Sequence, residues 1–85
     1  MIVSPKAWDD LGIIDEQMKI RIVKKLRWFV NQENPLYFAT RLTGFFYGKY
    51  RFRIGDYRAI FDVDERGAIT ILLILRVKHR REVYE

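Results

Sequence analysis

Two short segments near the end of this 85-residue chain are dense in lysine and arginine. The first segment, residues 49–58, holds Lys49, Arg51, Arg53 and Arg58; the second, residues 76–81, holds Arg76, Lys78, Arg80 and Arg81, with His79 among them. Aromatic residues lie between or beside these charges: Tyr50, Phe52, Tyr57 and Tyr84. Guanidinium groups next to aromatic rings suit phosphates and stacked bases.

If Arg51, Arg58 and Arg80 point to one face, they form a positive surface that can hold a phosphodiester and stabilise a pentacoordinate transition state. No cluster of Asp, Glu and His has the spacing of metal ligands, so this chemistry would use neither metal nor cofactor. RNA supplies its own nucleophile, the 2′-hydroxyl. Lys49 or His79 could accept its proton if nearby cations favour the neutral form.

The same residues have simpler interpretations. Alternating lysine and arginine often keep a strand solvated and protect a sheet edge. His79 could merely orient the end of a strand. From the residues alone, the basic segments therefore leave catalysis, binding and solubility open.

The composition limits the class of protein. Residues 1–85 make a single small domain. The chain has no cysteine and one histidine, which argues against a disulfide framework or a zinc site. The net charge of +5 favours an anionic partner. The longest apolar run, residues 68–75, is too short to span a membrane, and no signal peptide is visible, so we expect a cytoplasmic protein.

The N-terminal part predicts two helices. Ser4 is an N-cap candidate for a helix over residues 5–11, which Gly12 would end. Asp15 is the second N-cap candidate, followed by apolar residues at helical spacing and a basic outer face. This helix should stop by Asn34, because Pro35 disfavours a helical residue before it.

The C-terminal part predicts an antiparallel meander. From residue 47 the period changes to two, which places Lys49, Arg51 and Arg53 on one face. Residues 55–56 fit a hairpin turn, residues 57–63 the next strand, and residues 64–67 a second turn. Residues 68–77 are apolar on both faces, as in a central strand.

The expected fold class is therefore α+β, with two N-terminal helices packed on a small antiparallel β-sheet. Residues 1–3 could add an edge strand. Residues 36–46 are interpreted as a connection.

The run YRFRIGDYRAIF, residues 50–61, resembles the central signature of the RelE/ParE toxin superfamily. The tail RVKHRREVY, residues 76–84, resembles its C-terminal signature. The superfamily pattern also fits residues 4–7, which precede the helix pair. It fits Asn34-Pro35 as well, which residues 41–44 follow later in the chain. The resemblance covers nearly the whole chain and implies a RelE-like fold.

RelE-like members are toxins of type II toxin–antitoxin pairs that cut mRNA in the ribosomal A site by metal-free 2′-hydroxyl attack, which stops translation. The resemblance implies base-like roles for Lys49 and Arg51, phosphorane stabilisation for Arg58, a leaving-group role for Arg80 and substrate stacking for Tyr84. Arg51 stands where the best-studied type of member has a second lysine. Because a guanidinium is a poor proton acceptor, the base would be Lys49 or, as the second choice, His79.

The resemblance also implies partners. Contacts with mRNA and rRNA would involve Arg53, Lys78, His79 and Arg81. A RelB-like antitoxin would wrap the toxin with an acidic segment that is disordered until bound, and operator DNA would be reached only through it. No membrane is expected. The alternatives are a ParE-like inhibitor of DNA gyrase without nuclease activity, and a catalytically weak RelE-fold module that binds RNA or antitoxin.

Overall fold

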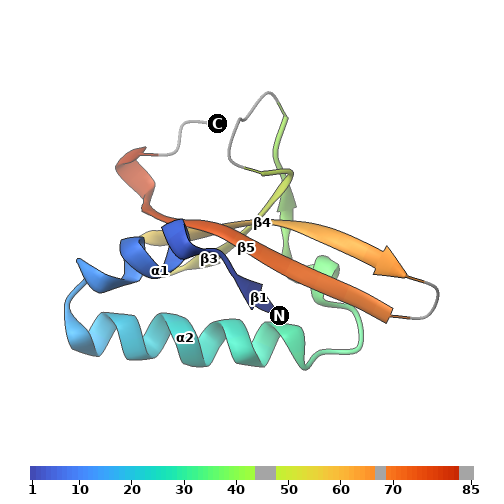
Figure 1. Ribbon diagram of the computed structural model, residues 1–85, viewed down its shortest axis with the longest axis horizontal. Helices are drawn as coiled ribbons and strands as arrows, with labels where there is room; N and C mark the ends of the chain where they lie inside the picture. Colours follow the sequence, from blue (N-terminus) through green and yellow to red (C-terminus); the bar gives the residue numbers. More distant parts are fainter. Residues whose placement is uncertain (44–47, 67–68, 83–85) are drawn as a thin grey trace.

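The computed structural model describes residues 1–43, 48–66 and 69–82 (Figure 1). Its elements are, in chain order, β1 (Ile2–Val3), α1 (Pro5–Gly12), α2 (Glu16–Val30), the 3-10 helix η1 (Pro35–Phe38), β2 (Thr40–Arg41), β3 (Tyr50–Ile54), β4 (Tyr57–Arg66), β5 (Ile69–His79) and the 3-10 helix η2 (Arg80–Glu82). The predicted α+β class is confirmed. No helix within the described ranges is long and apolar enough to cross a membrane.

Both predicted N-caps are present. The Ser4 hydroxyl accepts a hydrogen bond from the backbone N–H of Ala7 at 3.1 Å. The Asp15 carboxylate accepts hydrogen bonds from the N–H groups of Gln17 and Met18 at 3.2 and 3.3 Å. These bonds satisfy amides that have no partner inside the helix. Each helix therefore begins where its capping side chain predicts.

The sheet has five strands in the order β1-β5-β4-β3-β2. β3, β4 and β5 form the predicted antiparallel meander. Two features differ from the prediction: β1 pairs with β5 in parallel, which makes the sheet mixed, and β2 pairs with β3 inside the segment interpreted as a connection. Each of these strands has two residues, too few to give a periodic signal.

The two predicted turns have different outcomes. Ile54 and Tyr57 are cross-strand partners, which confirms the two-residue turn at Gly55 and Asp56. Gly55 has a φ of +60°, a conformation that glycine adopts without strain. The second turn was predicted too early, because β4 continues to Arg66 opposite Ile69. Backbone pairing along the hairpin overrides the turn preference of its acidic residues.

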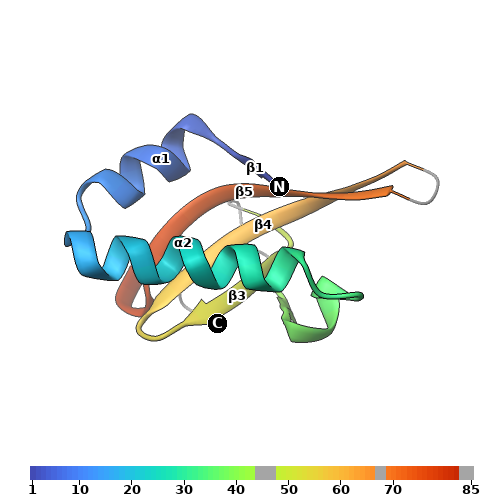
Figure 2. The ribbon, with the colours of Figure 1, turned by 90° about the horizontal axis from the view of Figure 1, so that it is seen from below.

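The helices pack on one face of the sheet (Figure 2). The buried core joins Leu11, Ile22, Leu26 and Phe29 from the helices to Phe52, Ala59, Phe61, Ile74 and Val77 from the strands. The rings of Phe29 and Phe52 stack with centroids 4.1 Å apart, and Phe52 stacks on Phe61 at 4.3 Å. The opposite face of β3 and β4 is left without a helical layer.

A bulge sets the direction of side chains at the end of β5. Phe61 pairs with Ile74 whereas Ile60 pairs with Arg76, so Leu75 is an extra residue. The Ser4 hydroxyl donates a hydrogen bond to the Leu75 carbonyl at 2.8 Å. An inserted residue shifts the alternation of every later side chain by one position. Val77 therefore enters the core, and the residues on either side of it point to the opposite face.

Candidate functional site

A row of basic residues crosses the helix-free face of the sheet. Arg53 on β3 is the cross-strand partner of Arg58 on β4, and Arg58 is the partner of Lys78 on β5. Arg51 lies two positions before Arg53 and therefore shares its face. We name Arg51, Arg53 and Arg58 the basic row. Their common face agrees with the period-two pattern of the sequence.

Arg58 is the most unusual residue of this row. It is 8% exposed, and it is the sole charged residue that is buried within the described part of the chain. Its Nη1 donates to the carbonyls of Gly55 and Tyr57 at 3.4 and 3.3 Å, which are long hydrogen bonds. Burial lowers the pKa of Arg58, and the charges of Arg51, Arg53 and Arg80 lower it further against the opposing effect of Asp56.

Arg51 stands in a similar environment. It is half-buried, and burial followed by the charge of Arg53 lowers the pKa of its guanidinium. A desolvated cation among other cations is stabilised when an anion binds. The basic row is thus suited to an anionic group, and its binding of a phosphate stays a prediction.

The tail is fixed to the turn between β3 and β4. The backbone N–H of Arg80 donates to the Asp56 carbonyl at 2.7 Å, and Arg80 Nε lies 3.7 Å from Asp56 Oδ1. The Glu82 carboxylate accepts hydrogen bonds from the backbone N–H of His79 at 3.2 Å and from Lys78 Nζ at 3.4 Å. These contacts bring the charge of Arg80 close enough to Arg58 to lower the pKa of the Arg58 guanidinium.

Other predicted site residues lie apart from Arg58. His79 is the cross-strand partner of Tyr57, and the two rings meet edge to face with centroids 5.3 Å apart. Tyr57 packs against the core, so His79 lies on the helix side of the sheet, away from the basic row. Its Nδ1 accepts a hydrogen bond from the N–H of Arg81, which is exposed.

Lys49 and Lys78 have acidic neighbours. The backbone N–H of Lys49 donates to Asp62 Oδ1 at 2.7 Å, and the Lys49 side chain is exposed. Lys78 Nζ lies 4.0 Å from Asp10 Oδ1 and 3.4 Å from Glu82 Oε2. Tyr84 lies outside the described residues. The catalytic and RNA-binding roles of all these residues stay predictions.

Sequence reasoning missed Asp10. Its carboxylate accepts two hydrogen bonds from the Arg76 guanidinium, at 2.8 and 3.0 Å, and one from the Val77 N–H at 2.9 Å. Burial alone would raise the pKa of Asp10, but these bonds and the charges of Arg76 and Lys78 lower it below 3.8. Asp10 thus attaches α1 to the end of β5. Nothing in the local sequence indicates this contact.

The family model described as ParE toxin of type II toxin-antitoxin system, parDE, matches residues 1–84. The chain belongs to this family, and it is a type II toxin of the RelE/ParE superfamily. The resemblance seen in the sequence is thereby confirmed. None of the curated proteins matches the sequence significantly.

Two solved structures share the fold. A chain of the toxin-antitoxin complex RelBE2 from Mycobacterium tuberculosis is 26% identical, with a TM-score of 0.74 over 92% of this chain and 93% of that chain. A chain of the RelB-RelE antitoxin-toxin complex from Methanococcus jannaschii is 20% identical, with a TM-score of 0.60 over 96% of this chain and 93% of that chain. The second similarity bears on the fold alone.

Proposed function

We propose that this toxin is a ribosome-dependent endoribonuclease that cuts mRNA in the A site without a metal ion. The buried guanidinium of Arg58, surrounded by the charges of Arg51, Arg53 and Arg80, carries this proposal. Keeping a cation desolvated beside like charges destabilises a fold unless an anion binds there. A phosphodiester supplies that anion.

In the proposed reaction, the 2′-oxygen attacks the adjacent phosphorus while Lys49, in its neutral form, takes the hydroxyl proton. The bond from phosphorus to the 5′-oxygen breaks, which leaves a 2′,3′-cyclic phosphate and a 5′-hydroxyl. Arg58 stabilises the extra negative charge on the phosphorane, and Arg80 stabilises the departing oxygen until a water molecule gives it a proton. Arg51 adds positive charge, and Tyr84 stacks on the substrate.

We further propose a RelB-like antitoxin as the partner that holds the toxin inactive in the cytoplasm. The solved structure that is 26% identical to this chain comes from a toxin–antitoxin complex, which supports this partner. An acidic antitoxin would also complement the chain's net charge of +5. Operator DNA would be bound by the antitoxin and not by this chain.

A second candidate function is inhibition of DNA gyrase without RNA cleavage. The ParE name of the matching family favours it. Inhibition of gyrase gives no role to the buried Arg58 of the basic row, and we therefore place this function second. A third candidate, a catalytically weak module, follows from Arg51 at a position where a lysine would be the better base.

The decisive experiment is a translation assay with purified ribosomes, in which primer extension maps the 5′ ends of the mRNA. We expect cuts inside the A-site codon that are absent with free mRNA and absent with Arg58→Ala or Arg80→Ala. Arg27→Ala, an exposed arginine on α2, serves as the matched control and should cut normally. Full activity of both site variants would refute the nuclease. If the wild-type chain never cuts, a gyrase supercoiling assay tests the second candidate.

A further inference from the structure

The turn from β5 into η2 is held by a reciprocal pair of hydrogen bonds. His79 Nδ1 accepts the backbone N–H of Arg81 at 3.2 Å, and the backbone N–H of His79 donates to Glu82 Oε1 at 3.2 Å. The first side chain caps an amide of the helical turn, and a glutamate three positions later caps the amide of the first residue. This arrangement is a capping box, in which the first residue is ordinarily serine or threonine. Here that residue is a histidine.

Arg80 lies inside this capping box. Its backbone N–H donates to the Asp56 carbonyl at 2.7 Å, so the amides of residues 79, 80 and 81 all have hydrogen-bond partners. An amide between two fixed neighbours has little freedom, and the capping box therefore sets the direction in which the Arg80 side chain leaves the backbone. The charge of Arg80 acts on Arg58. His79 thus reaches the basic row through Arg80, although its own ring lies on the helix side of the sheet.

The capping box requires a neutral imidazole. Because Nδ1 is the acceptor, the hydrogen of the neutral ring is on Nε2. A protonated ring carries a hydrogen on both nitrogens and has no acceptor left, so it cannot cap the Arg81 amide. A histidine side chain changes its charge between about pH 5 and pH 8, and the chain contains a single histidine. The capping box is therefore closed at neutral pH and opens in acid.

The charges around His79 act on the same equilibrium. His79 lines a cavity of about 120 Å³ to which α1, β4, β5 and η2 contribute. The ionisable groups that line this cavity or belong to η2 are Asp10, Tyr57, Lys78, Glu82, Arg80 and Arg81. Glu82 is exposed and can turn toward a charged ring, which would remove the other half of the capping box. Lys78 opposes this movement, because its Nζ lies 3.4 Å from Glu82 Oε2.

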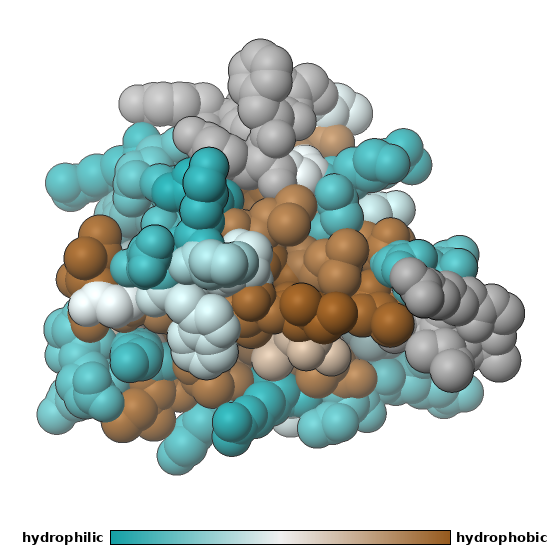
Figure 3. Space-filling view, viewed as in Figure 1, coloured by the Kyte–Doolittle hydropathy of each residue, from teal (hydrophilic) through white to brown (hydrophobic). Residues whose placement is uncertain are grey.

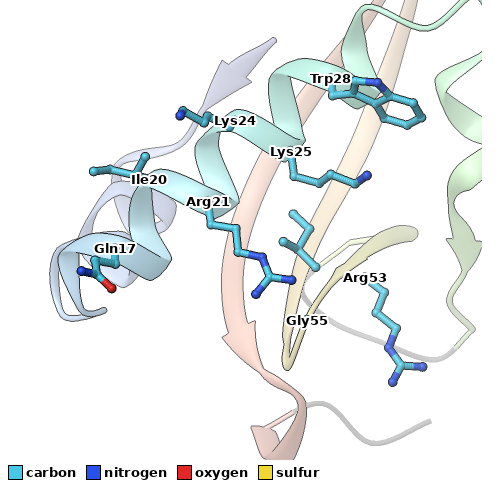
Figure 4. Close-up of a pocket in the computed structure, with 9 residues that line it drawn as sticks. Gln17, Ile20, Arg21, Lys24, Lys25, Trp28, Arg53 and Gly55 are labelled. Atoms are coloured by element: carbon cyan, nitrogen blue, oxygen red, sulfur yellow. The ribbon is translucent and has the colours of Figure 1, made fainter.

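The neighbouring surfaces differ from the surroundings of His79. The groove between α2 and β3 (Figure 4) has Arg21, Lys24, Lys25 and Arg53 as its charged residues, and such side chains stay protonated above pH 8. Figure 3 shows an apolar area over the middle of β5 and mostly hydrophilic residues on the side that carries η2. His79 is half-buried at the start of η2, so water and protons reach its ring.

We propose that His79 is a positioning residue for Arg80, because its neutral imidazole closes a capping box with Glu82 and protonation of the ring opens it. The neutral ring fixes η2 and holds Arg80 beside Arg58. The protonated ring releases the Arg81 amide, and Arg80 then moves away from the basic row. His79 itself takes no proton from the substrate in this role.

The first measurement is amide relaxation by NMR on the full chain without RNA. At about pH 7.5 the order parameters of the Arg80 and Arg81 amides should be those of rigid backbone, about 0.8, and at about pH 5.5 they should fall below about 0.6. His79→Asn keeps an acceptor that does not titrate, so both amides should stay rigid at both pH values. His79→Phe keeps a ring beside Tyr57 but has no acceptor, so both amides should be flexible throughout. Lys6→His added to His79→Asn is the matched control, and its exposed ring on α1 should not restore the pH response.

Equal rigidity of the wild-type chain at both pH values would overturn the proposal. Rigid amides in His79→Phe would overturn it as well, because packing of the ring would then be sufficient. A His79→Asn chain that becomes flexible in acid would assign the titration to Asp10 or Glu82 instead of His79.

The effect on cleavage rests on the proposed nuclease. In single-turnover reactions on ribosome complexes at about pH 7.5, His79→Phe should cut about tenfold more slowly than the wild-type chain, and His79→Asn should recover most of the rate. Protonation of Lys49 slows every variant alike, so the ratio of the wild-type rate to the His79→Asn rate is the measure, and it should fall toward about pH 6. A flexible His79→Phe chain that cuts at the wild-type rate would refute the positioning role. A wild-type chain that never cuts would refute the nuclease, and the amide measurement would still decide whether His79 controls η2.

Discussion

Arg53 and Arg58 are cross-strand partners, so two guanidinium groups share one face at the closed end of the β3–β4 hairpin. Like charges directly opposite each other destabilise a sheet. Arg53 is exposed to solvent, whereas Arg58 is buried and cannot be screened in the same way. The hairpin thus keeps an arrangement that folding alone disfavours, as functional sites often do.

The first prediction is that Arg58→Met stabilises the fold while it abolishes cleavage. Methionine fills similar space without a desolvated charge, and we expect a gain of about 1 kcal/mol, or about 4–8 °C in Tm. Arg53→Met, at the exposed partner, should shift Tm by less. Thermal unfolding followed by circular dichroism measures both. A lower Tm for Arg58→Met would mean that the arginine contributes net stability through its carbonyl contacts.

The second prediction concerns the attachment of α1 to β5. Asp10→Asn removes the charged acceptor of the Arg76 guanidinium and weakens the bond to the Val77 N–H, and we expect a loss of about 2–3 kcal/mol. Asp9→Asn, on the adjacent exposed residue, is the matched control and should be nearly neutral. Urea unfolding gives the free energies. Equal midpoints for the two variants would show that this contact is dispensable.

The third prediction is a pH dependence that comes from the same carboxylate. The pKa of Asp10 is lower in the folded chain than its ordinary 3.8, so the unfolded chain binds its proton first as pH falls. Its contribution to stability is therefore complete above about pH 4 and disappears as pH falls through the folded pKa. Urea titrations below pH 4 should show a shallower decline for Asp10→Asn than for the wild-type chain. Parallel declines would contradict this assignment.

Local patterns predicted most of the fold. Ser4 and Asp15 identified both helix starts through the chemistry of capping, and the turn at Gly55 and Asp56 fixed the β3–β4 hairpin. The parallel pairing of β1 and the bond between Asp10 and Arg76, which lie 66 positions apart, depend on tertiary packing that no short window of sequence contains.

The site was predictable to the same extent. The common face of Arg51, Arg53 and Arg58 follows from the alternation of strand residues on either side of a tight turn. The position of His79 does not, because the bulge at Leu75 shifts the alternation in β5 and turns His79 toward the helices. An apolar run gives no sign of such an inserted residue.

The fourth prediction tests a close contact beside the site. A Cβ atom at Gly48 would lie 3.0 Å from Ile60 Cγ2 and 3.2 Å from the Phe61 carbonyl oxygen, and that backbone atom cannot move aside. We expect Gly48→Ala to destabilise the fold by about 1–3 kcal/mol. Gly12→Ala is the matched control, since nothing lies within 4 Å of its added methyl group, and it should change stability by less than about 1 kcal/mol. Equal Tm values for the two variants would contradict the packing seen at Gly48.

The last prediction separates the position of the tail from the stability of the fold, and it rests on the proposed nuclease. Glu82 is exposed, so its pair with Lys78 should contribute less than about 1 kcal/mol to stability. Its carboxylate nevertheless accepts the His79 N–H and thereby shapes the turn that carries Arg80. Because small displacements of a catalytic group slow a reaction strongly, Glu82→Ala should cut about tenfold more slowly at an unchanged Tm.

Glu82→Gln keeps an oxygen acceptor for the His79 N–H and loses the charge that faces Lys78. It should therefore recover most of the cleavage rate, measured under single-turnover conditions on ribosome complexes. If Glu82→Ala cuts at the wild-type rate, the bond from the Arg80 N–H to the Asp56 carbonyl is sufficient to place Arg80. If both variants are equally slow, the cleavage rate depends on the Glu82 charge beside Lys78 more than on the hydrogen bond that shapes the turn.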